Sequence, residues 1–186
     1  YEGRGALARV MPGSLVDDLR RREFTVNAMA IELQSGAFGL HDPLGGRLDL
    51  AARRLRVLHP LSYVEDPTRI FRAARYATRL GLTRDPTTAR AQALALSLVP
   101  YPALSGQRLM AELARVLDEA RPAAVLTRLG TAGAFKLLDP RYRFTALTRR
   151  HVGELGAALA WARRLAPPPA DLAALALVGD QPRRVA

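Results

Sequence analysis

Hydrophobic and polar positions follow two different patterns along this chain of 186 residues. Up to residue 59 the apolar runs are short, and glycine and proline interrupt them repeatedly. From residue 60 onward, apolar residues recur at the spacings of three and four that mark one face of a helix. The pattern therefore predicts a small mixed segment followed by helices only, with a boundary near His59-Pro60.

Several short elements are predicted before this boundary. Ser14 followed by Asp17 resembles a capping box that opens a helix over 15–22. The run 24–33 is ambiguous, because its β-branched residues favour a strand and its Ala/Met centre favours a helix. The remaining expectations are a turn at Ser35-Gly36, a strand over 38–41 that completes a hairpin, a loop over 42–46, a helical turn over 48–53 and a strand over 55–58. With at most three strands, this segment is too short for an independent sheet domain and looks like the far half of a larger one.

The rest of the chain is predicted to be helical. The expected helices are 63–80, 86–98, 105–119, 121–132, 145–165 and 169–178, separated by proline and glycine. The predicted fold class is therefore α+β grading into mostly α.

Composition narrows the possible functions. The formal net charge is +11, and Lys136 is the only lysine, so arginine supplies nearly all of the basicity. Because arginine binds phosphate through two parallel hydrogen bonds, the excess charge favours a nucleic-acid partner. No apolar run approaches the roughly 20 residues that span a bilayer. The absence of cysteine excludes disulfides and thiolate metal sites and fits a cytoplasmic location.

The segment 65–75, EDPTRIFRAAR, carries the strongest candidate chemistry. On one continuous helix Glu65, Arg69, Arg72 and Arg79 share a face, with Asp66 at its edge. A carboxylate beside a guanidinium supplies the acceptor and donors that the edge of a nucleobase requires. The alternative is structural: Asp66 caps the helix, and Glu65 and Arg69 form an ordinary surface pair.

A second polar cluster lies at 17–28, just before an apolar run. Arginines beside acids, followed by Asn27, are suited to holding a triphosphate and a ribose hydroxyl. The alternative is a solvated helix end with a pair between Asp18 and Arg22.

Two further clusters have stronger structural explanations. In 42–50, Asp49 is expected to cap the following helical turn and Asp42 to close the loop around Gly46. A histidine-based metal site is rejected there, because the other histidines lack a suitable spacing. In 105–112, Arg108 and Glu112 are expected to form an intrahelical pair, or at most to support a neighbouring helix. No P-loop pattern occurs, since Lys136 is followed by leucine.

In this order, the motifs RRREFTVNA, HDPLGGRLDL, RLRVLHPLSYVEDPTRIFRAARYATRLGL and SGQRLMAELARVL resemble the class II tRNA nucleotidyltransferases. That family includes CCA-adding, CC-adding and A-adding enzymes and bacterial poly(A) polymerases. The resemblance runs from about Gly13 to Pro140. It implies a distal nucleotidyltransferase head over 1–59, a nucleotide-selecting helical neck over 60–120 and a partial, tRNA-binding helical body over 121–186.

The resemblance also implies roles for individual residues. Asp66 and Arg69 would bind the base edge of CTP or ATP, with Glu65 holding Arg69 in place. The residues implied near the ribose, phosphates or base pocket are Arg21, Arg22, Glu23, Asn27 and Arg72. Those implied to join head and neck are Asp42, Gly46 and Asp49, and those implied to support the neck are Arg108 and Glu112.

Two departures from the family pattern bear on activity. Glu23 stands where the family has aspartate, which moves a carboxylate by one methylene. The GSxxDxD motif that binds the family's catalytic Mg²⁺ does not occur, so the metal ligands are expected upstream of this chain. The implied function is addition of C, A or both to tRNA 3′ ends, with this chain inactive alone. The alternatives are a catalytically incomplete RNA- or nucleotide-binding module or subunit, completed by a missing head segment or partner, and a poly(A) polymerase.

Overall fold

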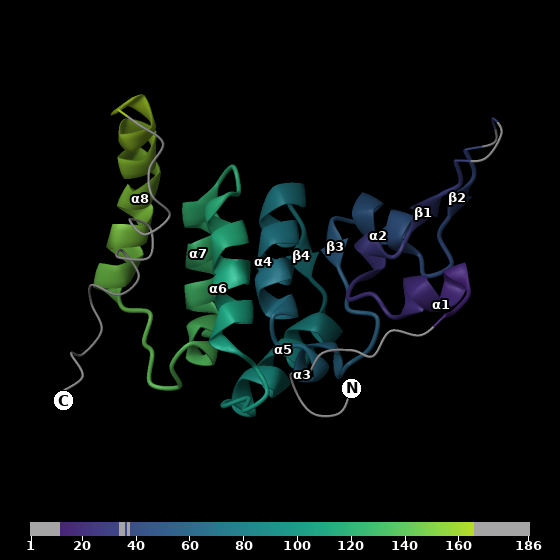
Figure 1. Cartoon of the computed structure of the whole chain (residues 1–186), viewed down its shortest axis with the longest axis horizontal. Coiled ribbons are helices and arrows are strands. Elements are labelled where there is room, and N and C mark those ends of the chain that lie inside the picture. The colour runs from purple at the N-terminus through teal and green to yellow at the C-terminus, as the bar shows by residue number, and fades with distance from the viewer. Residues whose placement is uncertain (1–11, 34–35, 37, 166–186) are drawn as a thin grey trace.

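The computed structural model describes residues 12–33, 36 and 38–165. Its elements lie along the long axis of the molecule in nearly chain order, with α1 at one end and α8 at the other (Figure 1). Helices dominate beyond the first quarter of the chain, so the predicted fold class is confirmed. No helix among the residues described is both long and apolar enough to cross a membrane.

The N-terminal elements follow the local signals closely. Helix α1 (Leu15–Arg20) opens with the predicted capping box, in which Ser14 Oγ accepts from the Asp17 backbone N–H at 3.2 Å. A 3-10 helix, η1 (Thr25–Asn27), and strand β1 (Ala30–Ile31) divide the ambiguous run between them. Strand β1 pairs antiparallel with β2 (Leu40–His41), which confirms the hairpin. Ser35, half of its predicted turn, lies outside the described residues.

We call the described residues before the predicted boundary, up to residue 59, the head segment, and two more elements complete it. Helix α2 (Gly46–Ala51) precedes strand β3 (Arg54–Leu55). A methyl group on Gly46 would lie 2.2 Å from the Thr25 carbonyl oxygen, so only glycine allows α2 to pack this closely on η1.

The single helix predicted over 63–80 is wrong, because the structure has two. Helix α3 (Ser62–Glu65) ends at Asp66, whose backbone is extended at φ −139° and ψ 94°, and α4 (Arg69–Leu80) begins three residues later. The ring of Pro67 disfavours the helical conformation at the residue before it. The expected N-cap at Asp66 is therefore a correction: the N-cap of α4 is Thr68, and the Asp66 carboxylate accepts from the Thr68 backbone N–H just before the helix begins.

A short strand interrupts the helices, against the prediction of helices only. Strand β4 (Thr83–Arg84) pairs in parallel with β3 of the head segment, and a two-residue strand is too short to give a periodic pattern. The other elements are close to their predicted positions: α5 (Pro86–Ser97), α6 (Gly106–Leu117), α7 (Pro122–Thr131), the 3-10 helix η2 (Ala134–Leu137) and α8 (Ala146–Leu165). The helix predicted over 169–178 lies outside the described residues.

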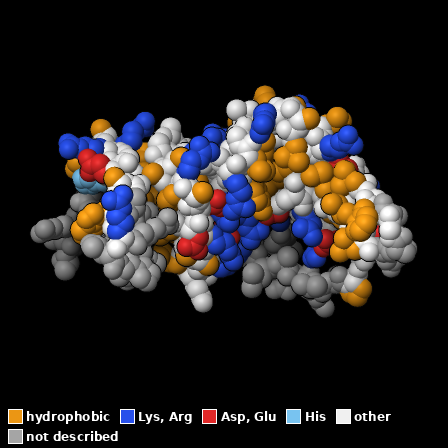
Figure 2. Space-filling model, turned by 90° about the horizontal axis from the view of Figure 1, so that it is seen from above, with side chains coloured by type: hydrophobic (Ala, Val, Ile, Leu, Met, Phe, Trp, Pro, Cys, Tyr) orange, Lys and Arg blue, Asp and Glu red, His pale blue; other side chains and the backbone are white. Residues whose placement is uncertain are grey.

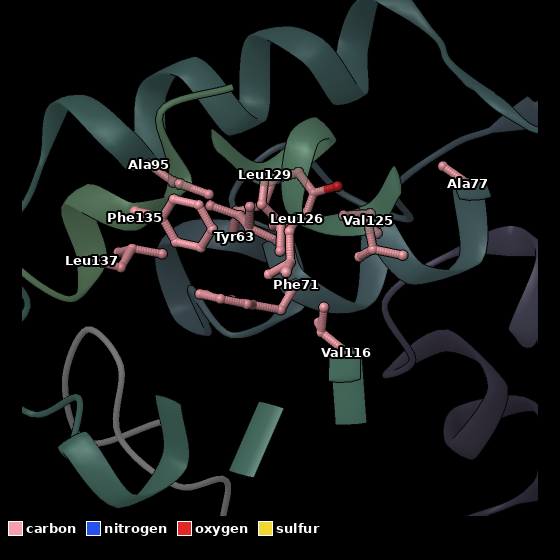
Figure 3. Packing of buried hydrophobic residues seen from close by; sticks show 14 of the residues in the cluster. Tyr63, Phe71, Ala77, Ala95, Val116, Val125, Leu126, Leu129, Phe135 and Leu137 are labelled. Carbon is pink, nitrogen blue, oxygen red and sulfur yellow. The ribbon is translucent and has the colours of Figure 1, made fainter. Parts of the chain in front are cut away.

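One hydrophobic cluster joins the head segment to the helices. Phe24 and Leu55 are fully buried in the same cluster as Tyr63 and Phe71. Figure 3 shows Tyr63 and Phe71 from the start of the helical region lying among side chains of α7, including Leu126. Hydrogen bonds also cross the predicted boundary at residue 59. The backbone N–H of Thr83 donates to the Arg53 carbonyl, and the Val57 N–H donates to Thr88 Oγ1 at 2.9 Å. This packing places α4 against the residues before the boundary.

Candidate functional site

Asp66 lies at the bend between α3 and α4. Its Oδ1 atom accepts from the Thr68 N–H at 3.1 Å and the Thr68 hydroxyl at 2.6 Å, and from Arg108 of α6 at 2.9 Å. Its Oδ2 atom accepts no hydrogen bond from the described residues, and the side chain retains 13% of its exposure. The bend therefore holds one carboxylate oxygen firmly and leaves the other available as an acceptor.

Arg69 begins α4 and is almost fully buried, with 7% of its side chain exposed. Its Nη1 atom donates to Ser62 Oγ at 2.9 Å and lies 3.8 Å from Glu65 Oε2, both on α3. Glu65 therefore accompanies Arg69 as expected, but the pair is not an ordinary surface pair.

Asp66 and Arg69 are held by different neighbours, and their joint contact with a base edge stays a prediction. Asp66 is bonded to Arg108 of α6, whereas Arg69 is bonded to Ser62 of α3. The break between α3 and α4 means that Asp66 and Arg69 do not lie on one continuous helix, as the helical wheel assumed. The two side chains are neighbours along the chain that contact different partners.

A second group of predicted residues is brought together between the residues that follow α1 and helix α4. The Glu23 carboxylate accepts from Arg72 Nη1 at 2.7 Å and from Asn27 Nδ2 at 3.0 Å. Burial would raise the pKa of Glu23, but the bonds from Arg72 and Asn27 outweigh it and hold the pKa below its usual range. Glu23 is thus a buried carboxylate that stays charged at neutral pH. Its side chain, one methylene longer than the aspartate of the family pattern, still contacts both Arg72 and Asn27.

Arg21 and Arg22 lie apart from that buried group. Both are exposed, and both donate to Asp18, Arg21 Nε at 2.8 Å and Arg22 Nη2 at 2.9 Å. The bonds from Arg22 and Arg21 lower the pKa of Asp18. The structural alternative, a pair between Asp18 and Arg22 at a helix end, is confirmed, and contact with a triphosphate stays a prediction.

Asp49 does not cap a helix, which corrects the sequence expectation. It lies inside α2, is fully buried, and accepts from Thr25 Oγ1 at 2.6 Å, Arg54 Nε at 2.6 Å and Arg56 Nε at 2.8 Å. Burial alone would raise the pKa of Asp49, but these three bonds lower it. The helix starts too early for Asp49 to be its cap.

The N-cap of α2 is Gly45, and Asp42 closes the preceding loop as expected, accepting from the backbone N–H groups of Gly46 and Arg47 at 2.7 and 2.9 Å. All bonds of Asp42 and Asp49 join parts of the head segment. Asp42, Gly46 and Asp49 were expected to join the head to the neck, and this expectation is wrong. Their bonds stay within the head segment, whereas Glu23 of that segment bonds to Arg72 of α4.

A ladder of charges between α4 and α6 was not predicted. Arg72 and Arg75 of α4 lie 3.2 and 3.5 Å from the Glu112 carboxylate of α6. Arg75 also reaches Glu119 at 2.8 Å, and Arg79 completes the row. We call Arg72, Arg75, Arg79, Glu112 and Glu119 the α4–α6 ladder. Figure 2 shows basic side chains gathered in a band across the middle of the molecule, with acidic ones among them.

The ladder corrects the expected pairing of Arg108 with Glu112. Arg108 donates to Asp66 instead, and Glu112 accepts from Arg72 of α4 and from Arg115. Of the two expected roles, the intrahelical pair is wrong and the support of a neighbouring helix is confirmed. A sequence signal did exist, because the arginines repeat at intervals of three and four on α4, and Glu112 of α6 is followed seven residues later by Glu119, just beyond the end of that helix. That signal does not say which helix faces which.

Comparisons with known proteins agree with the motifs. A family described as the poly A polymerase head domain matches residues 3–56. The chain is 37% identical over 162 residues to an A-adding tRNA nucleotidyltransferase of Geobacter sulfurreducens, covering 87% of this chain and 18% of that protein. It is 38% identical over 187 residues to a CC-adding tRNA nucleotidyltransferase of Deinococcus radiodurans, covering 98% of this chain and 49% of that protein.

Solved structures show the same relationship. The complex of a CCA-adding enzyme with CTP aligns at a TM-score of 0.81 and 32% identity, over 91% of this chain and 41% of that one. The complex of a CCA-adding enzyme with ATP aligns at a TM-score of 0.79 and 32% identity, over 89% of this chain and 40% of that one. The chain thus spans less than half the length of each of these relatives.

Proposed function

We propose that this chain, which is a relative of the tRNA nucleotidyltransferases, is the nucleotide-selecting part of an enzyme that adds C, A or both to tRNA 3′ ends. The relatives named above add A or CC, and the aligned structures hold CTP or ATP. Because transfer RNA is the substrate class of those relatives, we also propose a cytoplasmic location.

The free Oδ2 atom of Asp66 is the observation that carries this proposal. Cytosine and adenine both carry an exocyclic amino group, which donates hydrogen bonds. Uracil and guanine carry a carbonyl oxygen at the equivalent position, which a carboxylate repels. A fixed carboxylate oxygen therefore accepts the two bases that such an enzyme adds and rejects the other two.

Arg69 supplies the complementary chemistry beside this acceptor. Its guanidinium is held by Ser62 and lies near Glu65, so it loses little further freedom when a base binds. Guanidinium N–H groups donate to ring nitrogens, which both cytosine and adenine present next to the amino group. The neighbouring pair of Glu23 and Arg72, with the exposed Arg21 and Arg22, would face the ribose and the phosphates.

The residues described here do not fit the Mg²⁺ ion that the family uses. They contain no group of three or more histidine or acidic side chains that could hold a metal. The buried carboxylates Glu23, Asp49 and Glu112 already face arginines, which satisfy their charge. We therefore assign this chain base selection and RNA contact, and no chemical step.

Nucleotide binding by Asp66→Asn tests the proposal. The amide keeps the shape of the side chain but loses the negative charge, so we expect CTP and ATP to bind about tenfold more weakly, as for loss of one polar base contact. Titration calorimetry on the 186-residue chain would measure this, with UTP and GTP as the rejected nucleotides.

Asp139→Asn is the matched control. Asp139 also precedes a proline and also accepts from the backbone N–H two residues later, at 2.9 Å from Arg141. It therefore shares the local geometry of Asp66 but lies between η2 and α8, away from the bend. Equal nucleotide affinities for both variants, with unchanged circular dichroism, would contradict the proposed role of Asp66.

A further inference from the structure

A second, separate pocket lies on the side of α7 that faces β4. Its volume is about 530 Å³, and its lining residues are Arg84, Ala123, Ala124, Thr127, Arg128, Thr131 and Ala132. Arg84 and Arg128 also border the alanine side of α4, next to Ile70 and Ala74. The arginines of the α4–α6 ladder leave α4 on its other side, toward α6. The pocket is therefore distinct from the candidate site at Asp66.

Arg84 and Arg128 line this pocket, and Arg121 acts on Arg128 from outside the lining. Arg84 donates to Gln92 Oε1 at 2.5 Å, and Arg121, two turns before Arg128, donates to the Thr78 carbonyl at 2.6 Å. Both acceptors are uncharged. Within the described part of the chain, no carboxylate forms an ion pair with any of the three, and Arg128 has no hydrogen-bond acceptor. The contrast with the α4–α6 ladder, where every arginine meets a glutamate, is plain.

The electrostatics of Arg128 agree with this geometry. Its pKa is lowered first by partial burial and then by the positive charges of Arg84 and Arg121. Like charges held together reduce the stability of the folded chain, so the cluster opposes folding slightly. A bound anion would offset that repulsion and accept hydrogen bonds from the N–H groups of Arg128.

We propose that this pocket binds a phosphate group, with Arg84 and Arg128 as its ligands. A guanidinium presents parallel N–H donors that match two oxygens of a phosphate. The hydroxyl groups of Thr127 and Thr131, one helical turn apart on α7, add neutral donors at the same wall. Arg121 contributes charge from outside the lining.

Two sources supply such a phosphate: the backbone of an RNA chain, or free pyrophosphate of the kind that nucleotide transfer releases. The pocket is open enough for either, since its volume exceeds that of one phosphate several times over. Phosphate binding stands independently of the proposed function. The biological source of that phosphate, RNA or released pyrophosphate, rests on the proposed function.

The test is a nuclear magnetic resonance titration of the isotope-labelled 186-residue chain with pyrophosphate. The Thr127 and Thr131 amides and the Arg128 side-chain N–H report on this pocket rather than on the nucleotide site. We expect these signals to shift with pyrophosphate in the unmodified chain, and at least about tenfold weaker binding in the double variant Arg84→Gln/Arg128→Gln. Arg47→Gln/Arg90→Gln is the control, because it removes the same charge from two exposed arginines outside the lining.

The outcomes separate the possibilities. Weaker pyrophosphate binding in the pocket variant but not in the control variant supports the phosphate site. Equal loss in both, or no shift of the three reporter signals, overturns it. In a parallel filter-binding assay with tRNA lacking its 3′ end, weaker binding by the pocket variant alone assigns the phosphate to the RNA backbone. Unchanged RNA affinity, with pyrophosphate binding lost, assigns it to the free anion. Failure of Asp66→Asn to alter nucleotide binding would leave these readouts intact.

Discussion

Replacing Glu112 with glutamine removes the most connected charge of the α4–α6 ladder. Glu112 is 2% exposed, and its carboxylate lies 3.2 Å from Arg72, 3.5 Å from Arg75 and 2.6 Å from Arg115. Glutamine has the same volume and keeps one acceptor oxygen, so packing is preserved. The change therefore isolates the loss of the charge that the three guanidinium groups share, while Arg72 keeps Glu23 and Arg75 keeps Glu119.

The magnitude follows from how deeply these groups are buried. Removing one partner of a buried ion pair costs about 3–5 kcal/mol. Arg115 and Arg72 keep 54% and 36% of their side-chain exposure, so solvent screens part of the uncompensated charge. We therefore expect Glu112→Gln to lower the free energy of unfolding by about 2–3 kcal/mol. For a chain of this size, that is a fall in Tm of about 5–10 °C.

Chemical and thermal denaturation followed by circular dichroism would measure the loss. Glu154→Gln is the control, because its 3.0 Å pair with Arg150 lies on an exposed helix face where 61% of the glutamate is accessible. Such a pair is worth at most about 0.5 kcal/mol. A loss below about 1 kcal/mol for Glu112→Gln, or one equal to the control, would refute the reasoning that the ladder holds α4 against α6.

Two further predictions concern stability. Gly46→Ala should destabilise the chain by about 2–4 kcal/mol in urea denaturation, because the new methyl group would lie 2.2 Å from a backbone carbonyl oxygen. Gly106→Ala is its control and should not destabilise, since nothing lies within 4 Å of the added carbon; equal effects would contradict the packing argument. The second concerns acid: the pKa values of Glu23, Asp49 and Glu119 lie below their ordinary values of 4.5, 3.8 and 4.5 in the folded chain. Their stabilisation is therefore full at neutral pH and declines as pH falls below about 4.5 through the folded-state pKa values. Urea midpoints that stay constant down to about pH 3 would show that these carboxylates contribute nothing.

Much of the local structure is predictable from the sequence, because the signals act between residues close in the chain. The capping box of Ser14 with Asp17 and the pair of Asp18 with Arg22 join residues three and four apart. The bond from the Thr68 backbone N–H to Asp66 joins residues two apart. A short span restricts the possible partners to very few, so residue type and spacing are sufficient to predict the contact.

The candidate site is only partly predictable for the opposite reason. Its bonds join residues far apart in the chain: Asp66 with Arg108 over 42 positions, Arg72 with Glu112 over 40, and Arg72 with Glu23 over 49. An arginine-rich chain offers many equivalent partners for each acid, and attraction between charges carries no periodicity that would select one.

Residue type and spacing were sufficient to find the helices, the caps and the residues that carry the family resemblance. Only the packed structure decided the direction of Asp66, the burial of Asp49 and the partners of each arginine. The helical wheel assumed one helix over 63–80, and the bend at Asp66-Pro67 rotates the residues before it relative to those after it. Burial and charge pairing depend on which surfaces meet, and that is settled by the packing of whole elements around a shared core.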